Sequence, residues 1–123
     1  MRVVWMLLSL ASLVVPACAM GKRAAPRDVP PIVHQGVEYS FPHFGYLDEE
    51  GQNGGVVEAR DVKSGRRLWR LKVYTTRRFP WREQDVQDVF ITSAKLVGNS
   101  LVVTNEKGKT FEVNLATRAV RAR

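Results

Sequence analysis

Residues 54–73, GGVVEARDVKSGRRLWRLKV, contain two alternating runs joined by a compact turn. In the first run Val57 and Ala59 alternate with charged residues, and in the second Trp69 and Leu71 do the same. A period of two residues is typical of a strand with one face in a core and one face in solvent. The stretch therefore predicts a β-hairpin around which the fold is built.

The turn between the two runs is Asp61-Val62-Lys63-Ser64-Gly65. An aspartate at the start of a turn accepts hydrogen bonds from the backbone amides that follow it. Glycine adopts the positive φ angle that closes such a turn. We therefore expect Asp61 and Gly65 to have structural roles in this turn.

A weaker copy of the turn lies about fifty residues later, at Asn114-Leu115-Ala116-Thr117-Arg118. Both copies start with Asp or Asn, continue with an apolar residue and have a hydroxyl at the fourth place. The first copy resembles the repeat of quinoprotein-type β-propellers, over about half of the chain that follows the leader. Because two blades cannot close a ring, the resemblance implies neither the quinone cofactor nor any catalytic residue. The residues that carry it are Val57, Ala59, Asp61, Ser64, Gly65 and Trp69.

Other alternating or β-branched stretches complete the prediction. We expect a mainly β fold, either a small antiparallel sheet or an incomplete propeller-like or barrel-like domain built from hairpins. This single domain is expected to occupy residues 32–123. The further strands are predicted at 37–41, 86–95, 101–104 and 110–115, with turns at 98–99 and 105–109.

The first nineteen residues have the pattern of a secretory signal peptide. A basic start is followed by an apolar run over residues 3–15, which is too short to span a bilayer. Two interpretations of its end remain open. Residues 17–19, Ala-Cys-Ala, fit ordinary signal peptidase, whereas residues 15–18 resemble a bacterial lipobox that would make Cys18 the acylated first residue. Either interpretation predicts an exported protein, located in the periplasm, at the outer membrane as a lipoprotein, or outside the cell.

Residues 20–31 are rich in proline and basic residues, and they predict a flexible linker between the leader and the domain. Cys18 is the only cysteine, so an internal disulfide is impossible. The domain must therefore be stabilised by its apolar core.

The chain is basic, with a formal net charge of +7, and nine of its Lys and Arg residues lie between positions 60 and 82. Aromatic residues are interleaved with them, a combination typical of surfaces that bind anions. Since export disfavours a nucleic acid partner, we expect an envelope protein or an anionic membrane or polymer surface. The alternative is that these cations only keep the strand faces soluble. The candidate contact residues are Arg66, Arg67, Arg70, Lys72, Arg77, Arg78, Trp81 and Arg82.

A second hypothesis concerns His34, His43 and the acidic run 48–50, because imidazole and carboxylate groups bind metals. These residues suggest a small metal-dependent or hydrolytic exported enzyme. Their spacing matches no ligand motif, and the glycine-rich loop 51–55 has neither the P-loop nor the dinucleotide-binding pattern. We therefore predict a non-enzymatic envelope domain without catalytic, cofactor-binding or metal-binding residues.

Overall fold

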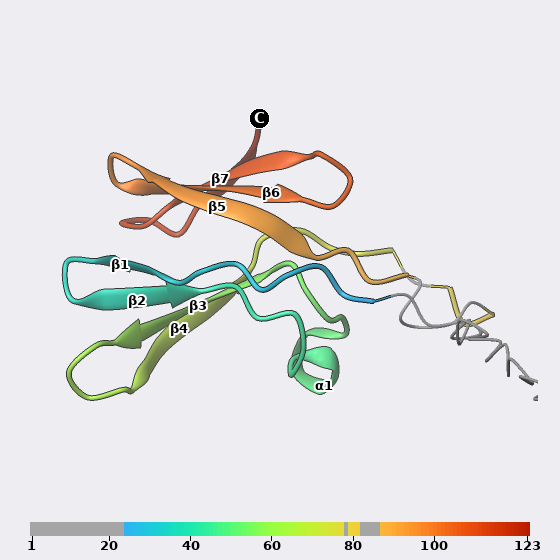
Figure 1. Cartoon of the computed structure of the whole chain (residues 1–123), viewed down its shortest axis with the longest axis horizontal. Helices are drawn as coiled ribbons and strands as arrows, with labels where there is room; N and C mark the ends of the chain where they lie inside the picture. The colour runs from blue at the N-terminus through green and yellow to red at the C-terminus, as the bar shows by residue number, and fades with distance from the viewer. Residues whose placement is uncertain (1–23, 78, 82–86) are drawn as a thin grey trace, which may run out of the picture.

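The computed structural model describes residues 24–77, 79–81 and 87–123, which form two four-stranded antiparallel sheets and one short helix (Figure 1). The strands of each sheet follow chain order, and neither sheet closes into a barrel over these residues. The mainly β prediction is confirmed. The first sheet contains β1 (Ile32–His34), β2 (Val37–Ser40), β3 (Val56–Asp61) and β4 (Arg67–Lys72). The second contains β5 (Ile91–Val97), β6 (Ser100–Asn105), β7 (Thr110–Asn114) and β8 (Val120–Ala122).

The two sheets form two layers that share one hydrophobic core (Figure 1). Val57 and Ala59 of β3 are fully buried in it, and so are Leu101 and Val103 of β6. The alternating residues behave as the sequence predicts, since Trp69 and Leu71 of β4 pack against the same core. The period of two residues therefore determines which face of each sheet is buried.

The turn between β3 and β4 is held by its own side chains. The Asp61 Oδ1 accepts hydrogen bonds from the amides of Lys63 (2.8 Å) and Ser64 (3.3 Å). The Gly65 amide donates to the Asp61 carbonyl at 2.8 Å, and Gly65 has a φ of 71°. The Ser64 hydroxyl accepts from the amide of Arg66 at 3.2 Å. These local contacts fix the shape of the turn backbone.

The turn between β7 and β8 repeats this arrangement. The Asn114 Oδ1 accepts from the amides of Ala116 (2.9 Å) and Thr117 (3.0 Å), and the Thr117 hydroxyl accepts from Ala119 at 3.3 Å. Arg118 takes the place of the glycine with a φ of 63°, and its guanidinium lies over the Trp69 ring. The two turns thus share one hydrogen-bond pattern, which is the structural form of the internal repeat.

Each of these turns is joined to the hairpin turn next to it in its sheet. The Val62 amide donates to the Gly36 carbonyl at 3.0 Å, and the Leu115 amide donates to the Asn99 carbonyl at 3.1 Å. All four turns lie at one end of the molecule, on the left in Figure 1. The β6–β7 hairpin turn lies at the opposite end.

Two local features differ from the sequence prediction. Strand β5 begins at Ile91 and not at residue 86, because the Phe90 amide donates to the side chain of Glu106 (2.9 Å) and not to a neighbouring strand. Residue 86, where the predicted strand starts, lies outside the described residues. The acidic run 48–50, for which no helix was predicted, belongs to helix α1 (Leu47–Glu50).

The packed part of the chain begins before residue 32. Val29 is buried in the core, and the Arg27 carbonyl lies 3.2 Å from Nε2 of the buried His43. Cys18 and the predicted signal peptide lie outside the described residues. The chain is therefore packed against the rest of the domain from Val29 onward.

Tyr74 connects the two layers and gives the protein an alkaline stability limit. Its hydroxyl donates to the Val89 carbonyl at 2.5 Å, and its ring stacks on Phe111 at 5.1 Å. Burial, together with the nearby Glu106 carboxylate, raises the pKa of Tyr74 well above its usual 10.0. The unfolded chain then loses this proton at a lower pH than the folded protein does.

We expect the free energy of unfolding contributed by Tyr74 to be constant below pH 10 and to fall as pH rises further, by about 1.4 kcal/mol per pH unit. Urea unfolding at several pH values, with tyrosinate absorbance of the folded protein, measures this. The Tyr74→Phe variant should lose stability less steeply over the same range. A folded protein in which all described tyrosines titrate near pH 10 would contradict the prediction.

Candidate binding surface

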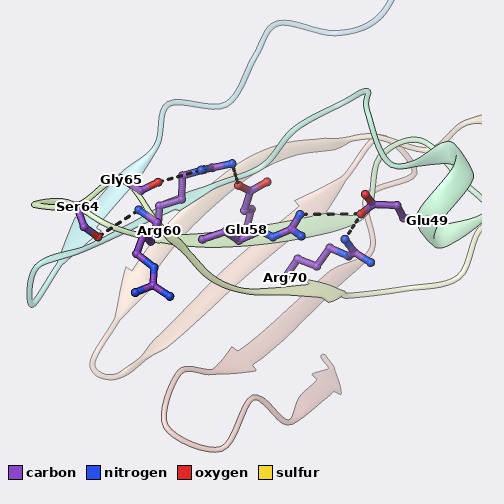
Figure 2. Close-up of polar contacts among 8 residues, drawn as sticks. Glu49, Glu58, Arg60, Ser64, Gly65 and Arg70 are labelled. Carbon is purple, nitrogen blue, oxygen red and sulfur yellow. Dashed lines mark hydrogen bonds and ion pairs between the residues drawn. The ribbon is translucent and has the colours of Figure 1, made fainter.

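The outer face of β4 carries Arg70 and Lys72, and helix α1 supplies carboxylates to it. Arg70 Nε donates to Glu50 Oε1 at 2.7 Å, and Arg70 Nη1 also pairs with the Glu49 carboxylate (Figure 2). Lys72 Nζ donates to the Glu50 carbonyl at 3.3 Å. These two candidate contact residues are therefore engaged within the domain.

A second pair holds the outer face of β3. Glu58 is only 5% exposed, and its carboxylate contacts the guanidinium of Arg60 (Figure 2). Arg60 Nη1 also donates to the Gly65 carbonyl at 3.0 Å. Because a buried carboxylate is costly without a partner, the pairing with Arg60 stabilises Glu58 within the fold.

The remaining cations of this hairpin gather at the β3–β4 turn. We use the name cationic turn surface for Val62, Lys63, Arg66, Arg67 and Leu68, all of which are exposed. Among the described residues, neither Lys63 nor Arg66 forms an ion pair, and Arg67 lies 3.9 Å from the Glu49 carboxylate at the edge of the surface. Positive charge is therefore presented to solvent here.

The shape of this surface depends on an irregularity in the sheet. Ala59 is opposite Trp69 and Arg60 is opposite Arg67, so Leu68 is an extra residue without a partner on β3. Such a bulge turns a side chain away from its regular direction. Leu68 is 51% exposed, as expected for the residue next to the core-facing Trp69. The bulge leaves Arg67 exposed as well, although it lies two residues before Trp69.

The other candidate contact residues lie elsewhere. Arg77 and Trp81 belong to the connection between the sheets, where both are exposed and contact the Phe79 ring. Trp81 is 76% exposed, so this candidate contact residue is accessible to solvent. Arg78 and Arg82 lie outside the described residues. The structure therefore separates the predicted set into a turn group, a paired strand group and a connection group.

The histidines of the metal hypothesis have different surroundings. His43 is 4% exposed and packs on Phe90 at 4.7 Å, while His34 ends the short strand β1. Two of the three carboxylates in the acidic run, Glu49 and Glu50, pair with Arg70. The described residues contain no group of three or more His, Cys, Asp or Glu side chains placed to hold a metal ion.

A hollow of about 580 Å³ lies between the connection and the β6–β7 turn. It is lined by the cations Arg77, Lys107 and Lys109 but also by Asp88 and Glu106. Its charge is therefore mixed, unlike that of the cationic turn surface.

No protein-family model and no curated protein matches the chain. The resemblance to quinoprotein repeats thus stays a prediction. Within the part of the chain that the structure describes, none of the helical segments has the length and apolar character needed to cross a bilayer.

Proposed function

We propose that this protein is a non-enzymatic domain of the cell envelope that binds an anionic surface or partner through the cationic turn surface. The observation that carries the proposal is a comparison of the two repeated turns. Lys63 and Arg66 occupy the places that Ala116 and Ala119 occupy in the second turn, which has the same hydrogen bonds. The turn therefore does not need cations at these places in order to fold.

The same hydrogen bonds also favour binding. A contact surface that is already rigid loses little conformational entropy when it meets a partner. The Asp61 side chain fixes the backbone on which Lys63 and Arg66 stand, because it accepts from the Lys63 and Ser64 amides. The expected export of the chain supports the choice of partner, since anionic lipids and polymers are abundant at cell surfaces.

The test is the salt-dependent retention of the protein on immobilised polyglutamate. The Lys63→Glu/Arg66→Glu variant should bind about tenfold more weakly than the wild type at low salt, because two contacting cations are replaced by like charges. Both side chains are exposed, so the free energy of unfolding should change by less than about 0.5 kcal/mol.

The matched control is Lys107→Glu/Lys109→Glu, which changes the net charge by the same amount at the opposite end of the molecule (Figure 1). Its affinity should stay within about twofold of the wild type. If both double variants lose affinity equally, net charge alone governs retention and the proposal is wrong.

A further inference from the structure

Building on the proposed function, we propose that the anionic surface is a lipid bilayer. Val62 and Leu68 enter its interfacial region while the three cations of the cationic turn surface contact the headgroups. The chemistry is that of a small interfacial anchor, in which apolar side chains are flanked by Lys and Arg.

The first support comes from the apolar residues themselves. Val62 and Leu68 are each 51% exposed, and they flank the cations of the turn on both sides. In the second turn the place of Val62 is taken by Leu115, which packs against the core. The repeated turn can therefore form with the side chain at this place packed against the core, so its geometry does not force Val62 to be exposed.

The second support is the bulge at Leu68. Leu68 points away from the core, opposite to Trp69, and the register leaves it without a partner on β3. A soluble polyanion gains nothing from an exposed leucine, whereas a bilayer interface removes it from water. The combination of charge and apolar side chains thus favours lipid over a soluble polymer.

The third support is the position of the surface. The β3–β4 turn lies at the end of the first sheet, at the lower left of Figure 1, and α1 lies toward the other end. A flat bilayer can therefore reach the turn with the acidic helix only at the edge of the surface, where Glu49 lies 3.9 Å from Arg67. The Asp61 carboxylate, whose Oδ1 accepts hydrogen bonds from two amides of the turn, keeps its negative charge. Residues 61–68 still carry a net charge of +2, from three cations and this one carboxylate.

The experiment uses the full chain with Cys18→Ser and a single spin-labelled cysteine, either Val62→Cys or Phe44→Cys. Phe44 is the matched control, since it is 59% exposed and lies three residues before α1. On vesicles with about 30% phosphatidylserine, the label at position 62 should become about fivefold less accessible to a water-soluble nickel complex and more accessible to oxygen. The label at position 44 should remain in water. On phosphatidylcholine vesicles, the accessibility of neither label to the nickel complex or to oxygen should change.

A second variant, Val62→Ser/Leu68→Ser, separates the two proposals. It should bind the anionic vesicles about tenfold more weakly than the wild type and should bind polyglutamate unchanged. If position 62 stays as water-accessible as position 44, the lipid inference is overturned, and the proposed function stands as long as Lys63→Glu/Arg66→Glu weakens polyglutamate binding. If that charge variant also binds like the wild type, both proposals are overturned.

Discussion

Replacing Gln52 with leucine is expected to lower the free energy of unfolding by about 3–5 kcal/mol. The side chain is 1% exposed, and its Nε2 donates to the carbonyls of Gly54 (3.1 Å) and Tyr74 (2.9 Å). Its Oε1 accepts from the Thr76 amide at 2.7 Å. Leucine has nearly the same volume but no polar atoms, so these three backbone groups would lose their partner in a buried place.

Urea denaturation measures the effect on Gln52→Leu, with Asn53→Leu as the neighbouring control. Asn53 is half-buried, and its side chain makes no hydrogen bond with the described residues. The control should therefore change the free energy of unfolding by less than about 0.5 kcal/mol. A loss below about 1 kcal/mol in Gln52→Leu would show that the three backbone groups find other partners.

Replacing Gly54 with alanine is expected to cost about 3 kcal/mol or more. Gly54 has a φ of +77°, and an added Cβ would lie 2.8 Å from Phe90 Cδ1 and 2.9 Å from the Val89 carbonyl oxygen. The phenyl ring can move, but the carbonyl is backbone that also accepts the Tyr74 hydroxyl. The clash therefore cannot be relieved by a side-chain rotation alone.

Gly108→Ala is the matched control for this prediction. Gly108 has the same φ of +77°, but nothing lies within 4 Å of an added Cβ. The free energy of unfolding of Gly108→Ala should fall only by the cost of placing alanine at a positive φ, about 1 kcal/mol. The difference between the two variants in urea denaturation isolates the contact with residues 89–90. Equal losses of unfolding free energy in the two variants would mean that residues 89–90 shift and relieve the clash at no further cost.

The hairpin and the core could be predicted from the sequence because their causes are local. The alternation that includes Trp69 and Leu71 fixes the buried face, whatever lies opposite. The turns depend on side chains that bond to amides two or three residues ahead, as Asp61 and Asn114 do. Neither feature requires knowledge of distant segments.

Which cations of the candidate surface are paired with carboxylates could not be predicted in this way. Arg70 pairs with Glu49 and Glu50, which precede it by about twenty residues and reach it only because α1 folds over β4. The start of β5 likewise depends on the side chain of Glu106, sixteen residues after Phe90. Both are tertiary contacts without a local pattern.

The exposed position of Arg67 did have a local signal. Counting back by two from Trp69 places Arg67 on the face that should be buried. An unpaired arginine is a poor core residue, so a break in the alternation between these positions was to be expected. The bulge is the structural form of that break.

The packing of the chain from Arg27 and Val29 onward limits how far the domain could lie from a lipid anchor at Cys18. If Cys18 is acylated, nine residue steps separate it from Arg27, whose carbonyl lies within hydrogen-bonding distance of His43. A fully extended chain of that length reaches about 30 Å, which exceeds the length of a six-residue strand of about 20 Å. The domain could then turn its β3–β4 end toward the membrane, but it could not move farther away than this reach. Such confinement raises the local lipid concentration into the millimolar range, so a turn with only weak intrinsic affinity would be bound for most of the time.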